Sequence, residues 1–142
     1  MYTNIVVGTD GSDTAAMAVD LAAGIARRDS ATLHLVGVTK IPVSMAGVPM
    51  AGGEPLTEEG FLALSDEAML LRIAADIDGV PVVTHAASGS PAAVIVAVAA
   101  DVGADLIVVG SKGMTGARKV LGSVPNSVAH GAGCDVLIAK TA

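Results

Sequence analysis

Aromatic residues are almost absent from this sequence: its 142 residues include one Tyr, one Phe and no Trp. Proteins that bind single-stranded nucleic acid stack its bases on aromatic side chains, so the composition disfavours that class of function. Because 52% of the residues are nevertheless hydrophobic, the core must be aliphatic. Such small side chains let helices lie close to a sheet.

Cysteine, positive charge and long apolar runs are scarce as well. Cys134 is the only cysteine, so no internal disulfide can form and a reducing compartment is expected. The net charge of −6 disfavours non-specific binding to nucleic acid. The longest apolar run, 91–100, is about half of the roughly 20 residues that span a bilayer, and residues 1–4 lack the pattern of a signal peptide. These absences predict a cytoplasmic protein with no membrane partner.

Short apolar segments alternate with helical patterns along the chain. The predicted strands are 5–8, 32–38, 80–86, 105–109 and 136–139, and the predicted helices are about 13–28, 57–77, a segment that opens at 90–91, and 124–131. Strands that are apolar on both faces and alternate with helices are typical of a parallel sheet with helices on both sides. Right-handed crossovers then favour an α/β fold with a doubly wound sheet, in a single domain over residues 1–142.

Helix starts carry residues that typically cap a helix. Ser12 or Asp13 can cap the first helix and Thr57 the second, whereas Ser90 is followed by a proline at the third.

Two of the helices carry apolar patterns. Met17, Leu21 and Ile25 lie at four-residue steps on one face of the first helix. The third helix is apolar nearly all round, which predicts that it is well buried. Residues 39–55 show no periodic pattern, and we interpret them as a long loop that is a candidate lid.

The best candidate for a functional site is formed by two loops. In an open parallel sheet, ligands bind beyond the carboxyl ends of the strands, where the strand order reverses. Thr9 and Asp10 follow the first strand directly, and a glycine-rich loop from Gly110 to Ser123 follows the fourth. If these two strands are neighbours, the two loops meet at this switch point.

The second loop has the features of a phosphate site. Gly110, Gly113 and Gly116 allow positive φ and a close approach of backbone amides to an anion. Gly122 and Ser123 then open a helix, whose free N–H groups favour a phosphate.

Positive charge gathers in the same loop: Lys112, Arg118 and Lys119 are three of the eight basic residues. Each feature alone has a simpler interpretation, since glycines make turns, basic residues are usually solvated, and Asp10 also fits a turn former. Their agreement at one place favours the phosphate site.

Several other sites are disfavoured. The Gly-x4-Gly-Lys-Ser/Thr P-loop does not occur, and the dinucleotide fingerprint does not follow the first strand. His34, His85 and His130 are isolated in sequence, and no metal-ligand spacing is present. Cys134 is interpreted as a small core residue. We predict no catalytic residue or metal ligand, and we find no convincing general base.

Three segments of the chain resemble the universal stress protein family. They are residues 5–12 (IVVGTDGS), residues 104–111 (ADLIVVGS) and Gly122-Ser123-Val124. The likeness covers essentially the whole chain. It implies a five-stranded parallel sheet in the order 3-2-1-4-5, of the adenine nucleotide alpha hydrolase-like type, and usually a homodimer.

The resemblance also implies a nucleotide site. By it, Asp10 contacts the adenosine moiety, Val38 lies at the adenine through its backbone, and four residues hold ribose and phosphates: Gly110, Gly113, Gly122 and Ser123. Thr9 belongs to the same site, and Ser111 and Val124 neighbour the phosphates. ATP, with or without Mg²⁺, is the implied ligand.

One spacing departs from the family pattern. ATP-binding members carry Gly-x2-Gly-x9-Gly-Ser/Thr, whereas eight residues separate Gly113 from Gly122 here. The shorter loop leaves AMP or cyclic AMP open as the ligand. It also leaves open a dimeric interaction module that binds no nucleotide. The phosphate loop keeps a nucleotide hydrolase open as a third function, but without a convincing general base any ATP hydrolysis is expected to be slow.

The last predicted strand bears on assembly. In this topology it lies at an edge of the sheet, and its apolar residues 136–139 form an aggregation-prone edge unless they are paired. Pairing with a second copy would give a symmetric homodimer. The sequence therefore predicts a nucleotide-binding, stress-response regulatory protein that acts as a homodimer.

Overall fold

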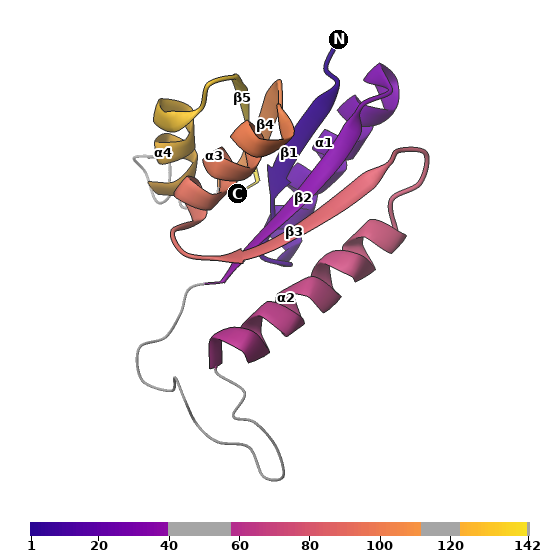
Figure 1. Cartoon of the computed structure of the whole chain (residues 1–142). Coiled ribbons are helices and arrows are strands. Elements are labelled where there is room, and N and C mark those ends of the chain that lie inside the picture. The colour runs from indigo at the N-terminus through magenta and orange to yellow at the C-terminus, as the bar shows by residue number, and fades with distance from the viewer. Residues whose placement is uncertain (40–57, 112–122, 142) are drawn as a thin grey trace.

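The computed structural model describes residues 1–39, 58–111 and 123–141. Within them, strands and helices alternate along the chain (Figure 1). The strands are β1 (Asn4–Gly8), β2 (Thr32–Thr39), β3 (Val82–Ser88), β4 (Leu106–Gly110) and β5 (Asp135–Ala139). The helices are α1 (Asp13–Asp29), α2 (Glu58–Ala75), α3 (Pro91–Val102) and α4 (Ser123–Gly131).

The five strands form one parallel sheet in the order β3-β2-β1-β4-β5. The doubly wound α/β fold and this strand order are therefore confirmed. The element bounds differ from the prediction mainly at β3, which begins at Val82 rather than at residue 80.

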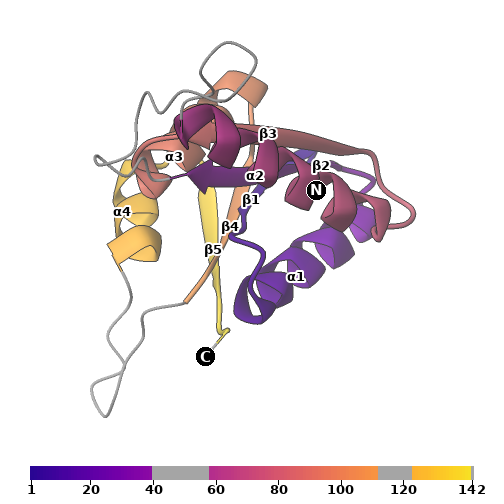
Figure 2. The same cartoon turned by 90° about the horizontal axis from the view of Figure 1, so that it is seen from below.

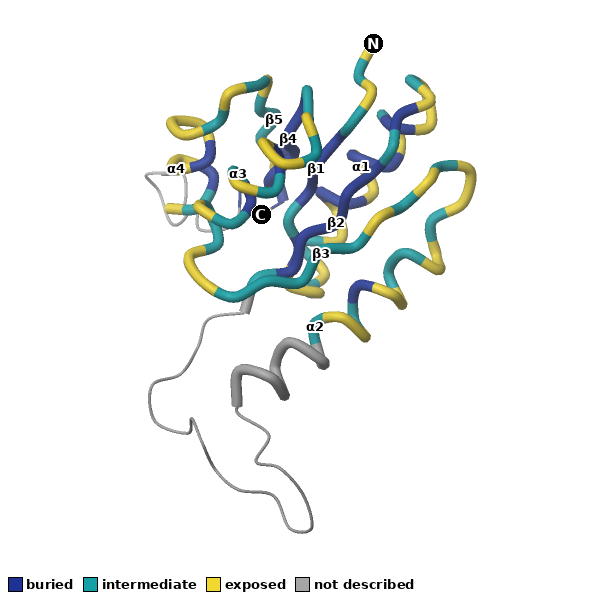
Figure 3. Tube along the Cα trace, viewed as in Figure 1, coloured by how far each residue is buried: buried dark blue, intermediate teal, exposed yellow. Residues whose placement is uncertain are grey.

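Helices cover both faces of the sheet (Figures 1 and 2). Ile5 and Val7 of β1 pack with α1 and α2 on one face, whereas Val6 packs with α3 and α4 on the other. All three side chains are fully buried, which explains why a central strand is a continuous apolar run. At the edge of the sheet, by contrast, no residue of β3 is fully buried (Figure 3).

Helix α1 buries small residues rather than large ones. Ser12 is its N-cap, and the Ser12 Oγ accepts a hydrogen bond of 3.2 Å from the backbone N–H of Ala15. The buried residues are Ala18, Val19, Ala22, Ala23 and Ala26. Met17 and Leu21, on the predicted apolar face, are 52% and 41% exposed. The alanine face packs against the sheet because its small side chains let the helix axis lie close to the large side chains of the strands.

Helix α3 is buried less than its composition predicts. Ser90 occupies the N-cap and Pro91 follows it, but the Ser90 side chain makes no capping hydrogen bond. Only Ile95 and Ala99 of this helix are buried. The prediction of a well-buried helix is therefore wrong, because a helix in an outer layer can place only one side against the sheet.

Three sequence predictions fall on residues that the structure does not describe. These are the cap at Thr57, the candidate lid after Thr39, and the loop residues 112–122. In the described part of the chain, no helix is both long enough and apolar enough to cross a membrane.

Candidate functional site

The two loops predicted to meet do start beside each other. Val7 near the end of β1 pairs with Val108 of β4 on one side and with Leu35 of β2 on the other. The chain after β1 enters α1 on one face of the sheet, whereas α4, which follows β4, lies on the opposite face. The carboxyl ends of β1 and β4 therefore form the switch point where ligands bind in this class of sheet.

A cavity of about 600 Å³ lies at this switch point. Its lining residues come from the ends of β1, β2 and β4, from the turn after β1, from the starts of α1, α3 and α4, and from the segment after β5: Gly8, Thr9, Asp10, Ala15, Val36, Val38, Pro91, Ile95, Val109, Gly110, Ser123, Val124, Pro125 and Thr141. The wall from β2 and α3 is apolar, whereas β1, α4 and the segment after β5 contribute polar groups. One side of the cavity is therefore apolar and the other side is polar.

The turn after β1 is held by its own side chains. Thr9 is buried and its N–H donates to the carbonyl oxygen of Val36 at 2.9 Å. The Thr9 hydroxyl accepts from the N–H of Gly11 at 3.1 Å, and Asp10 Oδ1 accepts from the N–H of Ser12 at 2.9 Å. Gly11 has a φ of +81°, a conformation that glycine adopts without strain. The exposed carboxylate of Asp10 is thus fixed at the rim of the cavity and also shapes the turn.

Two glycines keep the ends of β1 and β4 open. A Cβ atom on Gly8 would lie 2.7 Å from Ile95 Cδ1. A Cβ atom on Gly110 would lie 3.0 Å from Thr141 Oγ1. Side chains at these two positions would therefore displace residues that line the cavity.

Most of the predicted site residues that the structure describes line this cavity: Thr9, Asp10, Val38, Gly110, Ser123 and Val124. Gly113 and Gly122 lie outside the described residues. Ser111 is 1% exposed and is not in the lining. The Ser111 N–H donates to the Ala139 carbonyl at 2.8 Å, and the Ser111 Oγ accepts from the Thr141 N–H at 3.0 Å. Ser111 therefore braces the segment after β5.

Sequence reasoning missed several residues of the lining, among them Pro91, Ile95 and Thr141. None of them follows β1 or β4, and no local motif marks them. Pro91 and Ile95 reach the cavity because α3 crosses over β1 and β2. Thr141 reaches it because β5 is the neighbour of β4.

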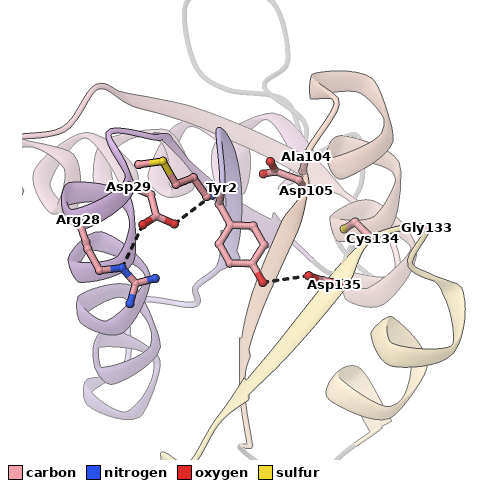
Figure 4. Close-up of a pocket in the computed structure, with 9 residues that line it drawn as sticks. Tyr2, Arg28, Asp29, Ala104, Asp105, Gly133, Cys134 and Asp135 are labelled. Carbon is pink, nitrogen blue, oxygen red and sulfur yellow. Dashed lines mark hydrogen bonds and ion pairs between the residues drawn. The ribbon is translucent and has the colours of Figure 1, made fainter.

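A second hollow, of about 740 Å³, lies at the opposite, amino ends of the strands (Figure 4). Its polar groups bind one another. The Tyr2 hydroxyl donates to Asp135 Oδ2 at 2.9 Å, and Asp29 accepts both from the Tyr2 N–H and from Arg28 Nε at 3.0 Å. The bond from Arg28, followed by that from Tyr2, lowers the pKa of Asp29. The carboxylates of Asp29 and Asp135 thus hold Tyr2 in place near the N-terminus.

Asp105 lines the same hollow and fastens the start of β1 to β4 (Figure 4). Its carboxylate accepts from the N–H and hydroxyl of Thr3 and from the N–H of Asn4, at 2.9–3.1 Å. Partial burial opposes ionisation of Asp105, but these donors outweigh it and lower the pKa. Cys134 is half-buried nearby, and burial raises the pKa of its thiol.

Two of the three histidines, isolated in sequence, meet in the structure. His34 of β2 and His85 of β3 lie on the α3 side of the sheet, with their nearest nitrogens 3.0 Å apart. Among the residues that the structure describes, no group of three His, Cys, Asp or Glu side chains is placed to hold a metal ion.

Comparison with known proteins identifies the family. The family model for universal stress proteins matches residues 1–140. The chain belongs to the universal stress protein family. It is 36% identical, over 146 residues, to a universal stress protein of Methanocaldococcus jannaschii, with 99% of this chain and 83% of that protein covered. A universal stress protein of Mycobacterium tuberculosis is 33% identical over 156 residues, with 99% of this chain and 97% of that protein covered.

Solved structures of universal stress proteins share the fold. One, in complex with cAMP, has a TM-score of 0.77 and 30% sequence identity, covering 99% of this chain and 98% of that one. Another, from Archaeoglobus fulgidus in complex with dAMP, has a TM-score of 0.63 and 26% identity, with 96% and 97% covered. These two universal stress proteins, which share the fold, are thus each seen with an adenine nucleotide.

Proposed function

We propose that this chain is a cytoplasmic regulatory protein of the stress response, a single domain that binds an adenine nucleotide at the switch-point cavity. The observation that carries the proposal is the cavity of about 600 Å³ at the carboxyl ends of β1, β2 and β4. Its volume falls in the range of about 300–1,000 Å³ that is typical of small-molecule sites. The similar proteins solved with cAMP and dAMP support the same ligand class.

The two ends of the cavity match the two ends of a nucleotide. Val36, Val38 and Ile95 give an apolar slot for the base. At the other end, α4 starts at Ser123, where the free N–H groups and the helix dipole favour a phosphate. Asp10 at the rim offers a carboxylate oxygen to accept from ribose hydroxyls.

ATP is the first candidate, with AMP and cyclic AMP as alternatives. The family's ATP-type loop is present but one residue shorter between Gly113 and Gly122. A monophosphate needs fewer contacts from that loop than a triphosphate does. The similar proteins solved with cAMP and dAMP support a monophosphate as the main alternative to ATP as the ligand.

The first experiment is to denature the purified protein, identify any released nucleotide by mass spectrometry, and titrate the stripped protein with ATP, AMP and cyclic AMP. Asp10→Ala should weaken binding at least tenfold, on the order of one lost charged hydrogen bond. Asp13→Ala is the matched control, because Asp13 is an exposed acid in the first turn of α1 outside the lining. Absence of binding to all three nucleotides would favour the interaction module instead.

We also propose a homodimer through β5. This strand is an edge of the sheet and carries the apolar residues Val136, Leu137 and Ile138. Sedimentation equilibrium should show a dimer at micromolar concentration, and a monomer there would contradict the proposal. Leu137→Asp should dissociate the dimer, whereas Val83→Asp, on the opposite edge strand β3, should not. Circular dichroism of both variants checks that they fold.

A further inference from the structure

Thr141 carries a buried hydroxyl that has no hydrogen-bond partner within residues 1–39, 58–111 and 123–141. The residue follows β5, is 3% exposed and lines the cavity. Its Oγ1 atom is buried and forms no hydrogen bond with any residue that the structure describes. Burying a hydroxyl without a partner is unfavourable, and a native fold rarely retains one without a use.

The backbone on both sides of this hydroxyl is fixed. The Thr141 N–H donates to Ser111 Oγ at 3.0 Å, and the Ser111 N–H donates to the carbonyl of Ala139 at 2.8 Å. Ser111 is itself 1% exposed. The two hydrogen bonds therefore hold the segment after β5 against the end of β4 and fix the backbone that carries the Thr141 side chain.

The Thr141 side chain occupies the space that Gly110 leaves empty. A Cβ atom on Gly110 would lie 3.0 Å from Oγ1 and 3.1 Å from Cγ2 of Thr141. Ser123 and Pro125 of the first turn of α4 belong to the same cavity. The hydroxyl thus lies at the β4–β5 side of the cavity, away from the apolar wall that β2 and α3 provide.

We propose that the Thr141 hydroxyl donates a hydrogen bond to a phosphate oxygen of the bound nucleotide, with Ser111 as its positioning residue. This inference rests on the proposed function. Rotation about the Cα–Cβ bond exchanges Oγ1 and Cγ2 among staggered positions, so the hydroxyl can turn to the ligand while the backbone stays in place. The ligand then supplies the partner that the hydroxyl lacks among the described residues.

Two substitutions separate the hydroxyl from the shape of the side chain. Thr141→Val keeps the shape and removes the hydroxyl, whereas Thr141→Ser keeps the hydroxyl. Calorimetric titration with AMP, ATP and adenosine should show at least a tenfold weaker affinity of Thr141→Val for AMP and ATP, as expected for a hydrogen bond to a charged group. Its affinity for adenosine should be unchanged. Thr141→Ser should stay within about threefold of the wild type for all three ligands.

The melting temperature without ligand provides a second measurement. Because the hydroxyl bonds to none of the described residues, Thr141→Val should melt no lower than the wild type. Unchanged affinity of Thr141→Val for AMP and ATP would overturn the inference and leave nucleotide binding intact. An equal loss of affinity for adenosine, or a lower melting temperature, would also overturn it. If the wild type binds none of the three ligands, the proposed function itself fails.

Discussion

His34 and His85 lie side by side on neighbouring strands, with His34 Nδ1 3.0 Å from His85 Nε2. On its other side, His34 Nε2 lies 3.2 Å from Oδ1 of Asn4. Since an amide oxygen only accepts, His34 carries a proton on Nε2; with both imidazoles neutral, its Nδ1 therefore accepts the Nε2–H of His85. In this arrangement Nδ1 of His85 can take up a proton without breaking either hydrogen bond.

The histidine pair predicts that the protein loses stability in mild acid. Burial lowers the pKa of both imidazoles, and the charge of His85 lowers the pKa of His34 further. The unfolded chain thus binds protons at a higher pH than the folded protein. The stabilisation is complete above the unfolded pKa of about 6.5 and is lost as the pH falls through the lower folded values. The melting temperature should be level above about pH 7 and decline below it.

A matched pair of variants tests whether the histidine pair causes the decline of the melting temperature in mild acid. His85→Gln removes one titrating group and retains an amide that can donate to His34. It should flatten the decline of the melting temperature between about pH 6.5 and pH 5. His130→Gln makes the same chemical change on an exposed residue of α4 and should leave the decline as in the wild type. Equal slopes for wild type and His85→Gln would exclude the pair as the cause.

Two glycines predict opposite effects of the same substitution. Apart from the adjoining residues and the helix's own backbone, no described atom lies within 4 Å of the position where a Cβ on Gly24 or Gly103 would be. Gly24 lies within α1, so Gly24→Ala should raise the free energy of unfolding by about 0.5–1 kcal/mol. Gly103 caps α3 with a φ of +65°, so Gly103→Ala should lower it by about 1 kcal/mol. Urea denaturation measures both, and shifts of the same sign would contradict the argument.

The fold was predictable because its strongest signals are local. The runs at Ile5–Val7 and 106–109 are apolar at every position, as strands buried on both faces must be. The buried face of α1 was not predictable from hydrophobicity alone. Alanines face the sheet while Met17 and Leu21 face outward, because the distance between helix and sheet, which only the tertiary structure sets, decides which face fits.

The candidate site also contains some residues that the sequence could predict and others that it could not. Thr9 and Asp10 follow β1 and Gly110 ends β4, so the topology brings them to the switch point once β1 and β4 are neighbours. Ile95 reaches the cavity because α3 packs over the sheet, and Thr141 because β5 pairs with β4; no local motif marks either residue. The contact between His34 and His85 depends on the β2–β3 register. It could not be predicted from the sequence, because no local pattern sets that register.

The Asp105 carboxylate should contribute measurably to stability, because it holds the amino end of β1. Asp105→Ala would leave the N–H groups of Thr3 and Asn4 without their acceptor. Because the site is partly solvated, we expect a loss of about 1–2 kcal/mol in the free energy of unfolding. Urea denaturation at neutral pH measures the loss, and Asp20→Ala, on the exposed side of α1, is the control that should change it little.

The same carboxylate has a pH signature that differs from that of the histidines. The donors from Thr3 and Asn4 outweigh burial and lower the pKa of Asp105 below its ordinary value of 3.8. Its contribution is therefore complete above that value and is lost only as the pH falls through the lower folded pKa. Asp105→Ala should accordingly be less stable than the wild type at neutral pH and approach it in strong acid. A difference that stays constant down to about pH 2 would show that packing, and not the ionised carboxylate, fastens β1 to β4.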